Sequence, residues 1–338
     1  MATLYLDRKG LDIDVENGAL ILREKGERVR SVPLTFLDRV VIRAEVSLTS
    51  SVLGELAHAG AETVVLSGRH GRKVAKIEGA RHNDARIRLR QYALFHDEVR
   101  RRIWAGRLLV SKIRAQIRAL SLILRGRPDR TSSMLPAIDQ LKKIERSLSD
   151  SFLTGLELPE LLGMEGGAGS LYFAALSSAF PPVLGFEGRN RRPPRDPVNA
   201  VLSLAYTLLH FDAVRTANMC GLDPMIGFLH EPAYGRDSLA CDLIEPLRSR
   251  IDLFAWELFR SRMLREDHFV FDKGACLLGK AGRQHFYPQY ELLARVLRRH
   301  LLRSARFLVK AIRKGFPEEF EDASDDLVQE GSDEVTLY

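Results

Sequence analysis

The chain has 338 residues, 45% hydrophobic and 28% charged, an ordinary globular composition with enough length for a substantial core. No apolar run reaches the roughly 18 residues of a membrane span. Residues 1–7 lack the basic and apolar regions of a signal peptide. Three cysteines without paired spacing, Cys220, Cys241 and Cys276, indicate reduced, buried thiols. We therefore expect a cytoplasmic protein that does not bind membranes.

The charge is unevenly distributed. Residues 317–338 contain nine Asp or Glu and no Lys or Arg, so the rest of the chain is nine charges more positive than the net value of +7. Such a basic body indicates a polyanionic partner, most simply nucleic acid. The alternative of a merely soluble surface stays open, because the charge is spread over a large body. We expect residues 317–338 to form a disordered acidic tail.

The first 82 residues predict a small β domain, with a sandwich as the expected form. Short runs with alternating or β-branched residues are separated by turn pairs such as Asn17-Gly18. One short helix is expected at 51–59. The predicted strands are 4–6, 11–15, 19–22, 28–32, 39–42, 62–66 and 74–77.

From residue 83 the hydrophobic pattern becomes helical and stays so to residue 316. A possible cap at Asp84 and a run of helix formers predict one long helix over 86–123. Further predicted helices are 137–157, 165–178, 197–219, 239–262 and 288–313. The predicted fold class is α+β, an N-terminal β-sandwich-like domain (1–82) followed by a larger all-α domain (83–316).

The first predicted helices are strongly basic. Residues 81–130 contain fourteen Lys or Arg against four Asp or Glu. Together these cations predict a surface that follows nucleic-acid phosphates, whereas for any single one a solvated helix face is the alternative. The candidates are Arg86, Arg90, Arg100, Arg101, Arg107, Lys112, Arg114 and Arg118.

A second basic segment is the proline-stiffened loop 185–197. Its last two residues, Asp196-Pro197, predict the start of the next helix, with proline at the first helical position. We do not expect its four arginines to be buried together, so they either contact DNA or lead into that helix. They are Arg189, Arg191, Arg192 and Arg195.

The most informative segment is 227–245, with one imidazole, a turn-rich loop and then two carboxylates three residues apart. We expect Ser238 to cap a helix that carries Asp242 and Glu245 on one face, and the following proline to kink it. Together with His230, such carboxylates can hold a divalent metal. Magnesium or manganese suits mixed nitrogen and oxygen ligands, and zinc stays open. Taken alone, His230 is more typical of a core histidine.

Three further features concern ligand binding. Tyr234 and Arg236 either order a phosphate or strand end, or belong to a plain surface turn. Glu165 lies among small and apolar residues, so a buried Glu165 needs an arginine or a metal as partner. Residues 274–281 have the spacing of a P-loop but end in alanine where Ser or Thr should hold magnesium. We interpret them as a chance match on a turn.

Three motifs together resemble the CRISPR-associated integrase family, the universal subunit of spacer acquisition, also described as a metal-dependent DNA endonuclease. The resemblance spans nearly the whole chain, including the order of β and α parts. The motifs are Met164-Glu165-Gly166-Gly167-Ala168, the stretch from Arg191 to Ala200, and Gly227-Phe228-Leu229-His230 with Ser238-Leu239, Asp242-Leu243 and Glu245-Pro246.

The resemblance implies a site for Mg²⁺ or Mn²⁺. Glu165, His230 and Glu245 would be the metal ligands, and Asp242 a catalytic acid beside the metal, in its outer sphere. Some family members have aspartate as the last ligand, so glutamate at 245 is an allowed variant. The predicted DNA contacts rest instead on the basic segments and the turn described above, and they are Arg86, Arg90, Arg100, Arg101, Arg191, Arg192, Tyr234 and Arg236.

The resemblance also implies partners and a reaction. The β domain would serve dimerisation and partner contact, and the helical domain catalysis. The expected partners are a second copy of the chain, a small ferredoxin-like CRISPR-associated dimer, and spacer-precursor and repeat-leader DNA. A spacer 3′-hydroxyl would attack a repeat phosphodiester, and with water the same site would cut DNA. A plain metal-dependent nuclease and a non-catalytic DNA-binding scaffold are the alternatives.

Overall fold

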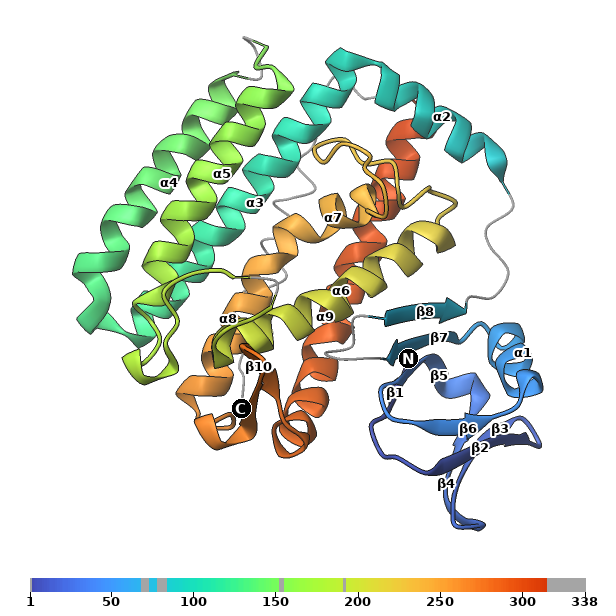
Figure 1. Cartoon of the computed structure of the whole chain (residues 1–338). Coiled ribbons are helices and arrows are strands. Elements are labelled where there is room, and N and C mark those ends of the chain that lie inside the picture. Colours follow the sequence, from blue (N-terminus) through green and yellow to red (C-terminus); the bar gives the residue numbers. More distant parts are fainter. Residues whose placement is uncertain (1, 68–72, 78–83, 152–154, 191–192, 315–338) are drawn as a thin grey trace. The chain divides into compact units, whose positions relative to one another are not determined.

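The computed structural model describes residues 2–67, 73–77, 84–151, 155–190 and 193–314 (Figure 1), so the acidic segment 317–338 lies outside the described residues. The chain divides into two compact units. One is Met1–His82 with Tyr287–Arg295, and the other is Asn83–Phe286 with Val296–Tyr338. The first is rich in strands and the second in helices, which confirms the α+β class. Within the described ranges, no helix is long and apolar enough to cross a membrane.

Two four-stranded sheets form the strand-rich unit. One has the order β1-β5-β7-β8 and the other β4-β3-β2-β6. All seven predicted strands are confirmed, and β6 was missed because three residues are too few to show alternation. The short helix predicted at 51–59 is confirmed as α1 (Ser50–His58). The strands are β1 (Ala2–Leu6), β2 (Leu11–Glu16), β3 (Ala19–Glu24), β4 (Glu27–Pro33), β5 (Leu37–Ile42), β6 (Val46–Leu48), β7 (Glu62–Ser67) and β8 (Lys73–Ile77).

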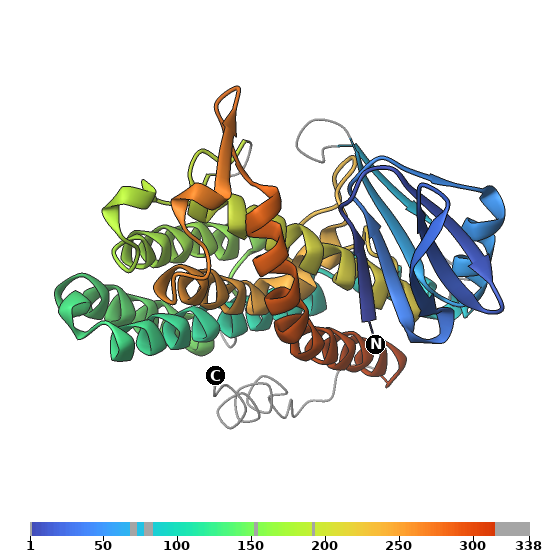
Figure 2. The same cartoon turned by 90° about the horizontal axis from the view of Figure 1, so that it is seen from below.

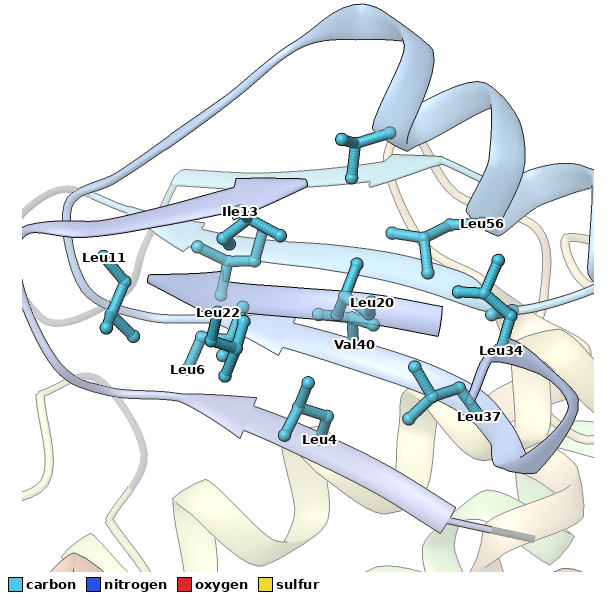
Figure 3. Close-up of a cluster of buried hydrophobic side chains, with 13 residues drawn as sticks. Leu4, Leu6, Leu11, Ile13, Leu20, Leu22, Leu34, Leu37, Val40 and Leu56 are labelled. Carbon is cyan, nitrogen blue, oxygen red and sulfur yellow. The ribbon is translucent and has the colours of Figure 1, made fainter. Parts of the chain in front are cut away.

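Strands of both sheets contribute to one apolar core, in agreement with the predicted sandwich. In β2, Leu11 and Ile13 are buried while Asp12 and Asp14 are exposed, as a half-buried strand requires. Figure 3 shows the cluster, to which β1, β3, β5 and α1 also contribute. Burying one leucine fully contributes about 1.5–3 kcal/mol, so this core stabilises the unit.

Part of the C-terminal helix α9 (Lys280–Lys314) belongs to the strand-rich unit. The rings of Tyr5 in β1 and Tyr287 in α9 stack with their centroids 4.0 Å apart. The Tyr5 hydroxyl donates to the Glu291 carboxylate at 2.7 Å. The predicted β domain, which ended at residue 82, did not include this helical segment.

A buried ion pair joins two strands of the first sheet. Arg39 of β5 and Glu62 of β7 are register partners, and each side chain is only 2% exposed. The guanidinium Nε and Nη2 lie 2.6 and 2.5 Å from Glu62 Oε2. Breaking such a pair from one side is costly, because the remaining charge stays buried.

Helices make up most of the second unit. In Figure 1, α3, α4 and α5 lie side by side, and all three pairs are in contact. The helix predicted at 197–219 is confirmed at both ends by α6. The helices of this unit are α2 (Ala85–His96), α3 (Glu98–Gly126), α4 (Thr131–Ser151), α5 (Leu158–Ser177), α6 (Pro197–Met219), α7 (Ser238–Ile244), α8 (Arg248–Arg260) and the remainder of α9.

The single helix predicted over 86–123 is wrong, because Asp97 separates α2 from α3. Asp97 adopts an extended conformation, and its carboxylate accepts from the backbone N–H of Arg100, so it caps α3.

The helix predicted over 239–262 is also interrupted. Pro246 lies in a 3-10 turn, Glu245–Leu247, between α7 and α8, which confirms the predicted kink.

A β-hairpin in the helical unit was not predicted. It consists of β9 (Phe269–Asp272) and β10 (Ala275–Leu278), and Figure 2 shows it projecting from the helices. Lys273 and Gly274 both have positive φ angles, as a two-residue hairpin turn requires. Residues 274–281 therefore span the hairpin turn at Gly274, strand β10 and the first two residues of α9, and do not lie on a turn alone as expected.

We predict that Arg39→Met lowers the free energy of unfolding of the strand-rich unit by about 3–5 kcal/mol, because it removes the cation that neutralises buried Glu62. The double change Arg39→Met, Glu62→Leu should recover most of that loss. Hydrogen exchange of peptides from β5 and β7 at increasing urea concentrations measures both. A double variant no more stable than Arg39→Met would contradict the prediction.

Candidate functional site

A cavity of about 240 Å³ lies within the helical unit. Its lining comes from α3, α5, α6, α8, the 3-10 turn before α8 and the loop before α6. Carboxylates, cations and tyrosines all face it, which is unusual for a packed core. The lining residues are Lys112, Gln116, Glu165, Gly166, Gly169, Tyr172, Phe173, Arg189, Tyr206, Glu245, Arg248, Ser249 and Asp252.

Asp242 holds the loop that carries His230. Its Oδ2 accepts from the backbone N–H of Phe228 and Leu229 at 2.5 and 3.1 Å. Its Oδ1 accepts from the backbone N–H of His230 at 3.0 Å and lies 2.7 Å from the ring Nδ1. An ionised carboxylate can only accept, so Nδ1 of His230 is the donor in this contact and Nε2 is the ring nitrogen that does not face Asp242. Asp242 therefore orients His230, and both oxygens of Asp242 already accept hydrogen bonds from this loop.

The loop before His230 also depends on a glycine. A Cβ at Gly227 would lie 2.7 Å from the backbone carbon of Ser238 and 2.8 Å from the carbonyl oxygen of His230. Any side chain would therefore push the loop away from the start of α7. The prediction that Ser238 caps this helix is wrong. It is the first helical residue, and its hydroxyl donates to the carbonyl of Glu231 at 2.9 Å.

Lys112 lies between the two glutamates of the predicted ligand set. Its Nζ forms an ion pair with Oε1 of Glu165 in α5 and lies 2.7 Å from Oε2 of Glu245. The side chains of Lys112 and Glu245 are 9% and 5% exposed, and Glu165 is 28% exposed. The structure thus brings Glu165 and Glu245 together around one ammonium group.

Arg248 neutralises Glu245 from the other side, with its Nε 2.8 Å from Oε1. Burial alone would raise the pKa of Glu245. The positive charges of Arg248 and, next, of Lys112 lower the pKa by more than burial raises it, so the pKa of Glu245 is about 2. Glu245 is therefore a carboxylate at any physiological pH, as a metal ligand must be.

A second buried carboxylate, Asp252 of α8, faces the same cavity. Tyr172 donates to it at 2.8 Å and Tyr206 donates to its other oxygen. Burial raises the pKa of Asp252 to about 6, although both tyrosine hydrogen bonds oppose the shift. Arg189 and Arg248 lie over the Tyr206 ring, at 5.2 and 5.0 Å from its centroid.

The predicted ligand set suits a divalent metal in its chemistry. Carboxylate oxygens and one imidazole fit magnesium or manganese, and a histidine oriented by a carboxylate is typical of metal sites. Among the described residues, no three acidic, histidine or cysteine groups already converge on a single point that could hold an ion. Lys112 instead separates Glu165 from Glu245. Glu165, His230 and Glu245 stay the predicted ligands, and the structure brings two of them, Glu165 and Glu245, to one ammonium group.

The predicted DNA-contacting arginines do not share one environment. Arg86 is 83% exposed and pairs with Asp84, and Arg100 is 56% exposed beside Asp97. Arg90 donates to the carbonyl of Arg313 at 2.9 Å.

Arg101 supports the loop that carries His230. It is 13% exposed, its Nε donates to the carbonyl of Phe228 at 3.0 Å, and its guanidinium lies over Phe95. Tyr234 is fully exposed, whereas Arg236 donates to the carbonyl of Glu231 and to Ser238. Arg191 and Arg192 lie outside the described residues. All eight DNA contacts stay predictions.

Sequence reasoning assigned Lys112 to the phosphate-binding helix surface, and that is wrong because it is buried beside the carboxylates. It missed the cavity roles of Tyr172, Tyr206 and Asp252. For Lys112, the sequence did contain a signal of burial. Lys112 and Gln116 are four residues apart in a stretch whose neighbours Leu109 and Ile113 are buried, so two polar residues interrupt an apolar helix face.

The fold and this cavity define a class, an α+β protein whose helical unit contains a cavity lined by carboxylates and cations. Residues 4–292 match the family described as CRISPR associated protein Cas1. The chain is 38% identical over 302 residues to the CRISPR-associated endonuclease Cas1 1 of Thermodesulfovibrio yellowstonii, covering 86% of this chain and 91% of that protein. The chain belongs to the Cas1 family, which confirms the resemblance.

Solved structures share the fold. A Cas1 protein from Thermotoga maritima has a TM-score of 0.81 and 21% identity, covering 95% of this chain and all of that one. A casposase bound to its integration product has a TM-score of 0.74 and 20% identity, covering 98% of this chain and all of that one. One chain of a Cas6-RT-Cas1–Cas2 complex has a TM-score of 0.77 and 21% identity, covering 93% of this chain and 35% of that one.

We predict a distinct pH dependence from Asp252. Its pKa rises from 3.8 to about 6 on folding, so the folded state retains a proton that the unfolded state loses between those values. The free energy of unfolding should therefore fall as the pH rises from 4 to 6, by at most about 3 kcal/mol, and then stay level.

Asp252→Asn cannot titrate and should lack that slope. Urea denaturation followed by the fluorescence of Trp104 and Trp256, both in the helical unit, measures the slope. The control Asp267→Asn changes an exposed carboxylate, 66% exposed, and should keep the slope. An Asp252→Asn protein with the wild-type slope would contradict the assignment.

Proposed function

We propose that this protein is a metal-dependent DNA integrase and endonuclease that inserts spacer DNA into a CRISPR array. The observation that carries the proposal is the pairing of Glu165 and Glu245 around one cation, in the unit where Asp242 leaves His230 Nε2 available. A cavity with further cations adjoins these carboxylates, so a phosphodiester is a better match than a neutral small molecule.

Names and structures of related proteins support the same function. The relative from Thermodesulfovibrio yellowstonii is named an endonuclease, and the casposase structure contains an integration product. The Cas6-RT-Cas1–Cas2 complex supports a second CRISPR-associated protein as partner. We accordingly propose spacer-precursor and repeat-leader DNA, a second copy of this chain and a small ferredoxin-like dimer as partners.

The proposed reaction replaces one phosphodiester with another. A spacer 3′-hydroxyl loses its proton as its oxygen bonds to phosphorus, and the 3′-oxygen displaced from that phosphorus leaves with the electron pair and takes up a proton, so no nucleotide cofactor is consumed. A bound magnesium or manganese ion would supply charge stabilisation at the phosphorus centre. Arg189 and Arg248, which line the cavity, would bind phosphate oxygens with their guanidinium groups. Asp242 keeps the His230 ring oriented throughout.

We predict that Glu165→Gln, His230→Ala and Glu245→Gln each lower both joining and cutting by at least about a hundredfold while leaving most DNA binding intact, because each removes a metal ligand. The assay offers branched and linear DNA substrates with Mn²⁺ or Mg²⁺ and separates joined from cut products. Exposed residues of the same types give matched controls, Glu266→Gln and His58→Ala, which should retain activity.

Three outcomes separate this proposal from its rivals. Full strand transfer by His230→Ala would contradict the metal-site assignment. Cutting without any joining would favour a plain metal-dependent nuclease. No manganese anomalous signal at Glu165, His230 and Glu245 in soaked crystals, together with no activity in the wild type, would favour a non-catalytic DNA-binding scaffold.

We also predict that exposed and buried arginines of the basic segment behave differently. Arg86→Glu and Arg100→Glu should each reduce the slope of log affinity against log salt concentration by about 1, because each variant binds one phosphate fewer. Arg101→Glu should instead destabilise the 228–231 loop. Filter binding between 50 and 300 mM salt (roughly the range over which the phosphate term dominates) measures the slopes. An unchanged slope for both exposed variants would contradict the proposed DNA surface.

A further inference from the structure

We propose that Lys112 is the internal counter-ion of the metal-free site, and that the arriving divalent cation displaces it toward Gln116. The inference rests on the metal site proposed above and adds a residue that exchanges places with the metal. Two independent observations carry it. One ammonium group contacts both predicted glutamate ligands, and Gln116 has a buried oxygen with no hydrogen-bond partner among the described residues.

Lys112 solves a charge problem in the metal-free protein. Glu165 and Glu245 point at one position, and two carboxylates that close repel each other unless a cation lies between them. Glu245 is 5% exposed, so water screens this repulsion poorly. Arg248 reaches Glu245 but forms no ion pair with Glu165 among the described contacts. Lys112 is the cation that neutralises both carboxylates together.

Lys112 and a divalent metal cannot use these oxygens at once. The ammonium lies 2.7 Å from Glu245 Oε2, with Glu165 Oε1 on its other side. A magnesium ion needs carboxylate oxygens at about 2.0–2.1 Å, so it would occupy the same space as Nζ. The metal would also place two positive charges against the ammonium charge. Metal binding therefore requires Lys112 to leave.

Gln116 offers the place to which Lys112 moves. It follows Lys112 by four residues in α3, so the two side chains are neighbours on one helix face. Gln116 is 5% exposed, lines the cavity, and its Oε1 is buried without a hydrogen-bond partner among the described residues. An unsatisfied buried acceptor is costly, and an ammonium group would satisfy it. The flexible lysine stem and the adjoining 240 Å³ cavity permit the movement.

The displacement has a consequence for the substrate. Lys112 lines the same cavity as Arg189 and Arg248. While it holds both glutamates its charge is neutralised. After displacement its charge faces the cavity and is available to a phosphate. Metal arrival would therefore also prepare the cationic wall that binds DNA.

Manganese binding to the full-length protein, measured from the free Mn²⁺ signal in electron paramagnetic resonance, tests the inference without an activity assay. Lys112→Met removes the competing cation at similar length, so Mn²⁺ should bind at least about tenfold more tightly. Its melting temperature should fall without metal and recover with saturating Mn²⁺. Gln116→Met removes the receiving acceptor and should weaken Mn²⁺ binding severalfold. Lys142→Met, at an exposed lysine of α4, is the matched control.

The outcomes distinguish this inference from the proposed function. If the wild type binds Mn²⁺ and Glu165→Gln abolishes that binding, the metal site is present. Equal or weaker binding by Lys112→Met then overturns the displacement alone. If the wild type binds no Mn²⁺, both proposals fail. Should Lys112→Met not fold, Lys112→Gln with the same measurement takes its place, and unaltered binding by both Lys112→Gln and Gln116→Met overturns the inference.

Discussion

The Asp242 carboxylate is the acceptor on which the site depends. It receives three successive backbone N–H groups, from Phe228 to His230, as well as the His230 ring. Charge-assisted hydrogen bonds of this kind are about twice as strong as neutral ones, so one side chain sets the path of the loop and the tautomer of the histidine. Arg101 holds the same loop through the carbonyl of Phe228. Neither residue needs to contact a substrate to be essential.

Around the cavity, the protein balances buried charges instead of avoiding them. Glu165 and Glu245 share Lys112, Glu245 also pairs with Arg248, and Asp252 is held by two tyrosine hydroxyls. An unpaired buried charge would cost several kcal/mol, so Glu245, which is 5% exposed, depends on its cationic partners. In the proposed function, a divalent cation would take the place of the monovalent Lys112 ammonium beside the same carboxylates.

The basic segment shows how charge that looks uniform in sequence separates in three dimensions. Arg100 and Arg101 are adjacent, yet one is 56% exposed and the other 13%. Lys112, in the same run of cations, is buried between carboxylates of two other elements. Successive helical residues point about 100° apart, so neighbouring cations face different surroundings, and the composition of a segment cannot say which face is solvent.

The sequence alone determined many of the local elements and the residue types of the predicted site, but not β6, the break at Asp97 or the β9–β10 hairpin. Asp196-Pro197 set the start of α6, Pro246 the kink after Glu245, and alternation the strands of the sandwich, because caps, prolines and side-chain periods act within a few residues. Glu165, His230 and Glu245 could be named from motifs. Only the tertiary structure decided that Lys112 lies between the two glutamates and that Asp242 is used up in holding the loop. The Lys112 contacts depend on how α3 packs against α5 and the turn after α7, because Lys112 and Glu165 are 53 positions apart and meet only through that packing. Asp242 meets the backbone of Phe228 and His230, 14 and 12 positions earlier, because the intervening loop returns the chain to α7.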